Sequence, residues 1–374
     1  MYDTCNYMDY PVGGEVTSIR NFLRYIREEM PQRVKNVLLV GVSCKEEEIG
    51  NIRSVLVDGT EFKFLAVTLA ATDLSQVKKS LRLEYVKGIW KYKKLIGIHK
   101  NDCQYIHTPE AFGVVKFLCP KAACYVFSHG TYFDMWKRVR FFKKQPLIRK
   151  MFQSYLLFVI RKCRGIFVLE RETYEDYAVY NKNVVHVGNS IVCHPYKERK
   201  LHEEKPLFFY AGRLSHVKNI GPMIEAVIQY EKDCSLLIAG DGEERLALEK
   251  LTGDSKRIHF AGAVTPDKVQ EFMAETDILI MNSVFEGIPM TILEAISNGM
   301  PVITTNVGGI KEVLRYGEDS IVTDGSVASI HVAMDGIIED YEKYSKEAYE
   351  TSLSFDYRKV NKKVFDVLNV TLQW

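Results

Sequence analysis

Several features that would place this chain in a common protein class are missing from its sequence. The eight cysteines form no Cys-x-x-Cys pair and no ligand-like spacing with histidine, which argues against a zinc site and against a secreted disulfide framework. The opening stretch, MYDTCNYMDYPVGG, lacks the basic and apolar regions of a signal peptide. No run reaches the ~18 apolar residues needed to span a membrane. We therefore expect a cytoplasmic protein.

The net charge of the chain is also small. The chain has 50 Lys and Arg against 48 Asp and Glu, a formal charge of only +2, so it is no general polyanion binder and we expect no nucleic-acid partner. A hydrophobic content of 47% and a charged content of 26% are ordinary for globular proteins. The length of 374 residues favours two domains.

Short apolar runs that mostly end at Gly, Asn or Asp mark the second half of the chain. They are PLFFYAG (206–212), CSLLIAG (234–240), RIHFAG (257–262), DILIMNS (277–283), MPVITTN (300–306) and DSIVTD (319–324). Uninterrupted apolar runs are typical of parallel strands buried on both faces, and helical patterns lie between them. The predicted fold is α/β, with a doubly wound parallel sheet.

The first half repeats this alternation less regularly. Strands are predicted at 34–43, 62–69, 103–108, 123–130 and 163–170. We expect a first domain over 1–195, a charged linker at 196–206, a second domain over 207–350 and a separate C-terminal helix at 351–374.

The stretch FEGIPMTILEA (285–295) places two carboxylates on either side of a predicted helix start. A helix N-terminus has free N–H groups and a partial positive charge, so it suits an anion. Pro289 can begin the helix because its missing N–H costs nothing there. Glu286 would then remain in the loop, while Glu294 lies in the helix. The pattern predicts a ligand that joins phosphate to a hydroxyl-rich sugar; the alternative is two solvent-facing acids.

Four ordered motifs support that ligand: AGRLSHVKNIGPMIEAV, LLIAGDGEERLALEKL, IHFAG and EGIPMTILEAISNGMPVITTNVGGIKEVL. Together they strongly resemble glycosyltransferase family 4. The resemblance implies the GT-B fold, in which two Rossmann-like domains face a cleft, with the C-terminal helix crossing back to the first domain. It also implies a retaining enzyme that moves a hexose-type sugar from a nucleotide-diphosphate donor to a glycan or lipid-linked acceptor, in bacterial surface polysaccharide synthesis.

The resemblance also implies roles for particular residues. Glu286 and Glu294 fit the family's Glu-x7-Glu signature, in which the first binds hydroxyls of the transferred sugar and the second binds the nucleotide ribose. The residues between them would complete the donor site: Gly287, Ile288, Pro289, Met290 and Thr291. Arg213 and Lys218 follow a strand, and in the family such cations take up the charge of the leaving diphosphate without a metal. No Asp-x-Asp motif is evident, so we expect neither a metal nor another cofactor; the alternative for both bases is an ordinary surface role.

Two more candidates lie in the first half. PVGGE (11–15) is a glycine-rich turn before a predicted helix, and such turns let the backbone approach a phosphate. The resemblance assigns Gly13 and Gly14 to substrate binding, although MYDTCNYM is a poor version of the apolar strand that the family places ahead of them. Either that strand is truncated or the sheet is built differently. His129 ends a strand and resembles the family's histidine near the donor sugar, while a lone strand-end histidine is otherwise structural.

Alternatives remain open at this point. GDGEER (240–245) imitates a dinucleotide fingerprint but lacks its third glycine, so a dehydrogenase is not indicated. VGGIKE (307–312) fits a ligand cap and a plain turn equally well. A GT-B epimerase or phosphorylase would share the fold, and so would a carbohydrate-binding protein without catalysis.

The stretch 135–165 concentrates positive charge, with ten Lys or Arg and no Asp or Glu. Aromatic residues such as Trp136, Phe141 and Phe152 interleave with the bases. Basic and aromatic residues together suit an anionic membrane surface. We hypothesise peripheral attachment to the inner face of the membrane, where a polyprenyl-linked acceptor would be met; the alternative is a solvated basic helix.

Overall fold

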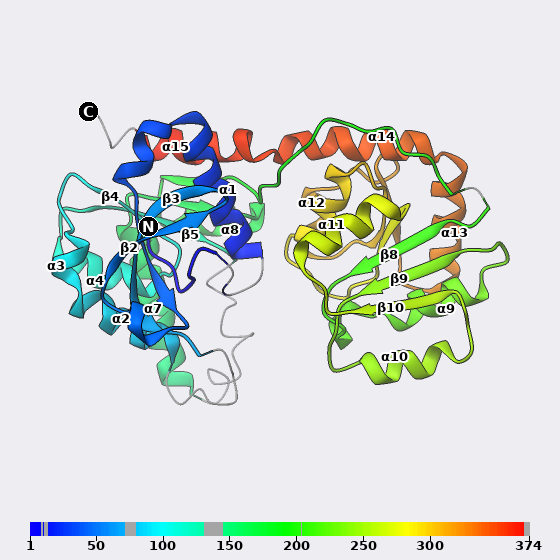
Figure 1. Ribbon diagram of the computed structural model, residues 1–374, viewed down its shortest axis with the longest axis horizontal. Helices are drawn as coiled ribbons and strands as arrows, with labels where there is room; N and C mark the ends of the chain where they lie inside the picture. Colours follow the sequence, from blue (N-terminus) through cyan, green and yellow to red (C-terminus); the bar gives the residue numbers. More distant parts are fainter. Residues whose placement is uncertain (9, 11–13, 72–79, 131–144, 203, 370–374) are drawn as a thin grey trace. The chain divides into compact units, whose positions relative to one another are not determined.

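The computed structural model describes residues 1–8, 10, 14–71, 80–130, 145–202 and 204–369. The chain forms two compact units (Figure 1): unit 1 comprises Met1–Ser190 and Tyr357–Trp374, and unit 2 comprises Ile191–Asp356. Each unit is an α/β structure whose strands pair mainly in parallel, which confirms the predicted fold class. Unit 2 begins at Ile191, which pairs with Asp356 through an isolated β-bridge. The charged stretch 196–206, which the sequence suggests as a linker, therefore belongs to unit 2.

Unit 2 contains a six-stranded parallel sheet in the order β10-β9-β8-β11-β12-β13. Its strands are β8 (Leu207–Ala211), β9 (Ser235–Ala239), β10 (Ile258–Gly262), β11 (Ile278–Met281), β12 (Val302–Thr305) and β13 (Ser320–Thr323). All six predicted strands are confirmed. The apolar runs are continuous because both faces of the sheet are covered: Phe208 and Tyr210 enter one core, while Phe209 and Ala211 enter the core on the opposite face.

Helical segments connect the strands of unit 2. They are η4 (His216–Lys218), α9 (Gly221–Gln229), α10 (Arg245–Thr252), α11 (Pro266–Glu275), α12 (Met290–Ser297), η5 (Gly308–Glu312), α13 (Val327–Glu339), α14 (Tyr341–Ser352) and η6 (Leu353–Phe355). Most crossovers between parallel strands therefore contain a helix, as a doubly wound sheet requires.

Unit 1 contains two sheets, of order β1-β3-β2 and β4-β5-β6-β7. The strands are β1 (Leu38–Ser43), β2 (Ile52–Val57), β3 (Thr60–Leu69), β4 (Cys103–Ile106), β5 (Ala123–Ser128), β6 (Gly165–Val168) and β7 (Val184–His186). Tyr2 joins the two sheets, since it forms parallel bridges to both Val40 and Ile106. The poor strand at the start of the sequence is thus a single bridging residue between β1 and β4.

The sequence did not predict two strands of unit 1. β2 pairs antiparallel with β3 at the edge of its sheet, and exposed residues interrupt its buried ones, so it has no continuous apolar run. β7 contains only three residues. Neither strand carries the signal that marks a parallel strand buried on both faces.

Helices cover the sheets of unit 1. They are α1 (Gly14–Glu29), η1 (Pro31–Asn36), η2 (Glu46–Glu48), α2 (Leu81–Lys91), α3 (Lys93–Ile96), α4 (Glu110–Leu118), α7 (Pro146–Lys162), α8 (Arg171–Ala178) and α15 (Tyr357–Asn369). The C-terminal helix α15 packs on α1, where the Tyr357 hydroxyl and Arg358 both bond Glu28. Within the described ranges, no helix combines the length and apolar character needed to cross a bilayer.

Candidate functional site

The sheet of unit 2 reverses its winding between β8 and β11. From β8 the chain proceeds through β9 to β10 on one side, and it returns through β11 to β12 and β13 on the other. In open parallel sheets, ligands bind at the carboxyl ends of the strands beside such a switch point, because the loops there diverge. The predicted Arg213 and Lys218 follow β8, and the predicted Glu286 follows β11. The topology thus brings these separate sequence motifs to one edge of the sheet.

Hydrogen bonds hold the loop after β8 against the loop after β11. The amide of Val284 donates to the carbonyl of Val217 at 2.9 Å, and the side-chain amide of Asn282 donates to the carbonyl of Asn219 at 3.3 Å. Asn219 has a φ of +49°, the left-handed conformation that ends η4 directly after Lys218. The position of Lys218 is therefore fixed from both sides.

Lys218 and Glu286 form an ion pair between Nζ and Oε1. The hydroxyl of Ser283 donates to the same Oε1 at 2.7 Å. The side chains are only 20% and 9% exposed, so water screens this pair weakly compared with a surface pair. The structure places two of the predicted catalytic residues in direct contact.

Two glycines brace the Glu286 loop. A Cβ atom on Gly308 would lie 1.8 Å from the carbonyl oxygen of Glu286, and Gly308 has a φ of +56°, which favours glycine. The amide of Gly309 donates to the carbonyl of Gly287 at 3.1 Å. The motif VGGIKE therefore supports the loop that carries Glu286.

Helix α12 begins directly after this loop. Pro289 is its N-cap and makes no side-chain cap bond, so the first turn at Met290 and Thr291 has no side-chain acceptor from its cap. The hydroxyl of Thr291 donates to the carbonyl of Ala211 at 3.4 Å, which ties this turn to the end of β8. The helix start thus lies at the switch point, where its amides and dipole suit a phosphate.

Glu294 lies on α12 between residues that pack into the core. Ile292, Leu293 and Ile296 are buried, while Glu294 is half-buried. Burial raises the pKa of its carboxyl group to about 7. Among the described residues, its carboxylate has no hydrogen-bond or ion-pair partner. An incompletely solvated carboxylate without a partner suits a ligand that brings hydroxyl donors.

Arg213 has a different setting from Lys218. Its guanidinium bonds Glu243 at 3.0 and 3.2 Å, and the two side chains are 74% and 55% exposed. The hydroxyl of Tyr210 donates to the backbone carbonyl of Arg213 at 3.1 Å, so the backbone is fixed while the side chain is solvated. The structure pairs Lys218, and not Arg213, with Glu286.

The glycines of GDGEER are explained by packing. A Cβ atom on Gly240 would lie 1.9 Å from the carbonyl oxygen of Gly212, and one on Gly242 would lie 2.2 Å from that of Leu214. These glycines let the loop after β9 approach the loop after β8.

In unit 1, His129 follows β5 and meets a second histidine, His107, which follows β4. Nε2 of His129 lies 2.9 Å from Nδ1 of His107 and 3.7 Å from a carboxylate oxygen of Glu15. Burial lowers the pKa of His129 to about 4, an effect that the nearby Asp3 opposes. Burial raises the pKa of Asp3 to about 6. The sequence did not single out His107 or Asp3, because each is a lone polar residue at the end of a short apolar segment.

The glycine-rich turn is only partly described. Gly14 is the first residue of α1, and Glu15 in the same turn approaches His129. Gly13 lies outside the described residues. In the part of the chain that the structure describes, no group of three or more His, Cys, Asp or Glu side chains is arranged to hold a metal ion.

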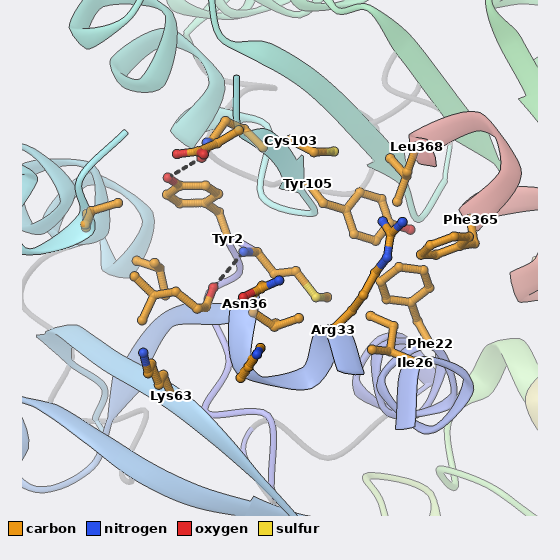
Figure 2. A pocket seen from close by; sticks show the side chains of 18 of the residues that line it. Tyr2, Phe22, Ile26, Arg33, Asn36, Lys63, Cys103, Tyr105, Phe365 and Leu368 are labelled. Atoms are coloured by element: carbon orange, nitrogen blue, oxygen red, sulfur yellow. Dashed lines mark hydrogen bonds between the residues drawn. The ribbon is translucent and has the colours of Figure 1, made fainter. Parts of the chain in front are cut away.

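A pocket of about 890 Å³ lies at the other end of the unit 1 strands (Figure 2). It is lined by the first residues of β1 and β4, Leu38 and Cys103, together with Tyr2, Arg33 and Tyr105. In the pocket the Tyr2 hydroxyl donates to Gln104 at 2.7 Å. It contains none of the predicted site residues, and the amino ends of parallel strands are not where open α/β sheets bind their ligands.

Comparisons with known proteins agree with the motifs. Residues 196–351 match the sequence profile of the family Glycosyl transferases group 1. The O-antigen biosynthesis glycosyltransferase WbnH of Escherichia coli is 30% identical over 188 residues, which are 50% of this chain and 53% of WbnH. The chain thus spans about half the length of the curated relatives it matches.

Solved structures resemble the chain over nearly its full length. A sucrose-phosphate synthase from Thermosynechococcus elongatus has a TM-score of 0.74 at 14% identity, covering 96% of this chain and 94% of that one. Anabaena HepE in complex with UDP and glucose has a TM-score of 0.67 at 16% identity, covering 96% of each chain. At such low identity the likeness concerns the fold, and it confirms the predicted GT-B class.

Proposed function

We propose, from the match of residues 196–351 to the family Glycosyl transferases group 1, that the chain is a glycosyltransferase that takes a hexose-type sugar from a nucleotide-diphosphate donor. The observation that carries the proposal is the Lys218–Glu286 pair beside the start of α12, at the switch point of the sheet. With Glu294 of α12, this edge of the sheet combines a cation, a helix N-terminus and two carboxylates. A ligand that joins a sugar to a diphosphate requires these groups.

The donor has a role for each group at this edge. The diphosphate lies at the first turn of α12, near Gly287, Ile288 and Pro289, and Lys218 leaves Glu286 to bind it. Glu286 then accepts hydrogen bonds from the sugar hydroxyls, and Glu294 accepts them from the ribose. Arg213 turns from Glu243 towards the diphosphate. HepE, which binds UDP and glucose, has the same fold and makes UDP-glucose the first donor to test.

The reaction proceeds with retention, as the family 4 resemblance implies. The acceptor hydroxyl attacks the anomeric carbon from the face that the diphosphate leaves, and a phosphate oxygen takes the hydroxyl proton. Lys218, Arg213 and the α12 amides offset the charge that grows on the diphosphate, without a metal. Glu286 is not assigned as a nucleophile because its carboxylate is committed to the donor hydroxyls and its Oε1 accepts from the Ser283 hydroxyl at 2.7 Å.

The acceptor is a glycan or a polyprenyl-linked glycan of a bacterial surface polysaccharide. The similarity to WbnH, an O-antigen biosynthesis enzyme, supports this class. Unit 1 supplies the acceptor side, and by the family 4 resemblance His129 is its candidate residue for contact with a sugar.

A basic face of unit 1 supports the proposal that the acceptor is met at an anionic membrane. We define this basic face as the helices α2, α3, α4 and α7, which lie together in Figure 1. Tyr155 of α7 bonds both Pro109 and Gly113 beside and within α4, and Trp90 of α2 contacts Phe117 of α4 with ring centroids 5.5 Å apart. The four helices therefore form one continuous surface.

Charge and exposed apolar side chains coincide on this basic face. Its cations are Arg82, Lys87, Lys91, Lys93, Lys94, Lys116, Arg149, Lys150, Arg161 and Lys162. Its acids are Glu84 and Glu110, and each is paired with a base of the same face. Phe117, Leu147 and Met151 are 72%, 71% and 65% exposed. Of the basic stretch 135–165, residues 135–144 lie outside the described part, and the rest contributes α7.

A donor screen tests the enzymatic proposal and separates it from the alternatives. A donor at ~100 times its dissociation constant stabilises a protein by roughly 2.7 kcal/mol, which thermal unfolding detects across UDP-, GDP-, ADP- and CMP-sugars. Transfer to an acceptor with release of nucleotide supports the proposal. Donor consumed with no acceptor and no glycoside formed indicates an epimerase, a colour from bound pyridoxal indicates a phosphorylase, and binding without turnover indicates a carbohydrate-binding protein.

A further inference from the structure

The two histidines of unit 1 lie at adjacent strand ends. Ile106 of β4 is in register with Val126 of the parallel strand β5, so the residues that follow both strands emerge at one edge. His107 and His129 stack there with ring centroids 5.1 Å apart, and Nδ1 of His107 lies 2.9 Å from Nε2 of His129. One hydrogen bond between two imidazoles needs one proton, so one ring donates and the other accepts.

The surroundings of His107 fix its ring. It is 4% exposed, it stacks on Phe127 at 5.3 Å with an interplanar angle of 17°, and it meets the edge of Tyr105 at 4.5 Å. Its backbone amide donates to the carbonyl of Tyr2 at 2.9 Å. Its second ring nitrogen, Nε2, is buried and has no hydrogen-bond partner in the part of the chain that the structure describes.

That buried Nε2 decides the direction of the hydrogen bond. If His129 donated, the proton of neutral His107 would be on Nε2, as a buried N–H donor without an acceptor, and such donors are rare in folded proteins. If His107 donates, its Nε2 keeps only a lone pair. Nε2 of His129 then accepts, and the proton of neutral His129 is on Nδ1. An ionised Glu15 would favour a proton on Nε2 of His129. At 3.7 Å from that nitrogen, however, its carboxylate makes no hydrogen bond.

We infer that His107 is a positioning residue that donates from Nδ1 to His129 and presents His129 as a neutral imidazole with its proton on Nδ1. This inference rests on the proposed function, in which His129 touches the sugar. The His129 side chain keeps 16% of its surface exposed, and Nδ1 has no hydrogen-bond partner among the described residues. His129 therefore donates a hydrogen bond to a sugar oxygen and does not act as an imidazolium acid.

The charges around the pair are consistent with a neutral state. Asp3 and Glu15 face His129, and the amino group of Met1 acts on His107. Asp3 alone would favour an imidazolium, but its Oδ1 is occupied by the Thr108 hydroxyl at 2.7 Å and by the Thr4 amide at 2.7 Å. The effect of burial is larger than that of Asp3, and it keeps the pKa of both histidines below the ordinary value.

Nuclear magnetic resonance of protein labelled with ¹⁵N-histidine tests the inference, because each ring nitrogen reports whether it carries a proton. His331 provides an internal reference: its Nε2 lies 2.8 Å from the carbonyl oxygen of Ala226, so its proton is on Nε2. We expect the opposite tautomer for His129, unchanged from pH 5 to 8. A wild-type His129 that resembles His331, or that titrates in this range, overturns the inference.

Two substitutions separate positioning from packing. His107→Asn places an amide donor near the former Nδ1, so it retains the His129 tautomer. His107→Phe retains the aromatic ring without the donor, so the proton of neutral His129 is no longer confined to Nδ1, its ¹⁵N signals move towards those of the Nε2 tautomer, and kcat/KM falls about tenfold. Equal spectra for the Phe variant and wild type contradict the inference. The spectra need no activity, so absent transfer would contradict only the proposed function, and if the Phe variant fails to fold, the wild-type and Asn spectra still decide.

Discussion

Lys218 and Glu286 lie 68 positions apart in the chain, yet their side chains form an ion pair with low exposure. Each follows one of the two strands, β8 and β11, that flank the switch point of unit 2. Without the donor, the two side chains neutralise each other. When the proposed donor binds, Lys218 moves to the diphosphate and Glu286 binds the sugar. The first two predictions follow from this relationship.

Glu286→Gln is expected to reduce turnover while the fold persists. Glutamine has the shape of glutamate and can still accept from Ser283, but it loses a charge-assisted contact to the reacting sugar, which lowers kcat about 10- to 150-fold. Steady-state transfer assays and thermal unfolding measure the two effects. Glu249→Gln is the matched control, because Glu249 pairs with Arg245 within α10 and with none of the proposed site residues. Wild-type rates in both variants would make Glu286 an ordinary structural acid.

Lys218→Ala and Arg213→Ala are each expected to slow transfer by on the order of 10²-fold or more, since each leaves charge on the leaving diphosphate unbalanced. Because these cations act without a metal in the proposed reaction, EDTA is expected to leave the rate unchanged. Rates measured with EDTA, and then with added magnesium or manganese, check this. Activity that disappears with the chelator and returns with the metal would refute the metal-free assignment.

Glu294 is expected to make both stability and donor binding depend on pH. Burial raises its pKa from the ordinary 4.5 to about 7, so the native state retains a proton that the unfolded chain loses. The stabilisation is complete below pH 4.5 and is lost as the pH rises through 7. Relative to Glu294→Gln, the wild type should lose on the order of 1 kcal/mol of unfolding free energy between pH 5 and 8.

Ribose hydroxyls donate to the ionised carboxylate, so binding of UDP-glucose, whose esterified diphosphate does not titrate in this range, should strengthen from pH 6 to 8 and release a proton. Calorimetry in two buffers of different ionisation enthalpy measures that proton. The Gln variant should show neither the proton release nor the pH dependence. A wild type that binds with no linked proton would show that Glu294 does not meet the ribose.

The basic face is expected to bind vesicles that contain anionic lipid, and to bind them less at physiological than at low salt. Changing Lys91, Lys93 and Lys94 to Gln should weaken co-sedimentation, with each base contributing about 1 kcal/mol. The control changes Lys250, Lys256 and Lys268 of unit 2. Equal losses in both triple variants, or no binding by the wild type, would contradict membrane docking, and binding to RNA in place of vesicles would assign the face to a different partner.

The sequence predicted unit 2 more completely than unit 1, for a physical reason. Strands such as β9 and β11 are buried on both faces, so their apolar runs are unbroken and their ends are marked by Gly or Asn. The contact of Lys218 with Glu286 could not be predicted from the motifs alone, because it depends on the order of the strands β8 and β11 in the sheet. In unit 1, a single bridging residue, Tyr2, takes the place of a strand, and no periodicity can reveal it.

His107 marks the limit of a reading based on motifs. It lies within the predicted strand segment 103–108, but its importance comes from the 2.9 Å contact with His129 from the neighbouring strand. The order of the strands determines that contact, and strand order cannot be predicted from local composition. The roles of Gly13 and Gly14 remain predictions, since only Gly14 lies in the described part.

Nucleotide release, measured with purified protein, donor and acceptor, shows whether the protein transfers sugar from a nucleotide-diphosphate donor. UDP-glucose with a polyprenyl-linked glycan acceptor is the first combination to use, followed by the donors that stabilise the protein in the thermal screen. We expect nucleoside diphosphate and a new glycoside to form in equal amounts, the glycoside to retain the donor's anomeric configuration, and Glu286→Gln to suppress both products. Donor that binds at the switch point of unit 2 but is never transferred, or products formed equally well by Glu286→Gln, would show that this site does not carry out the proposed transfer.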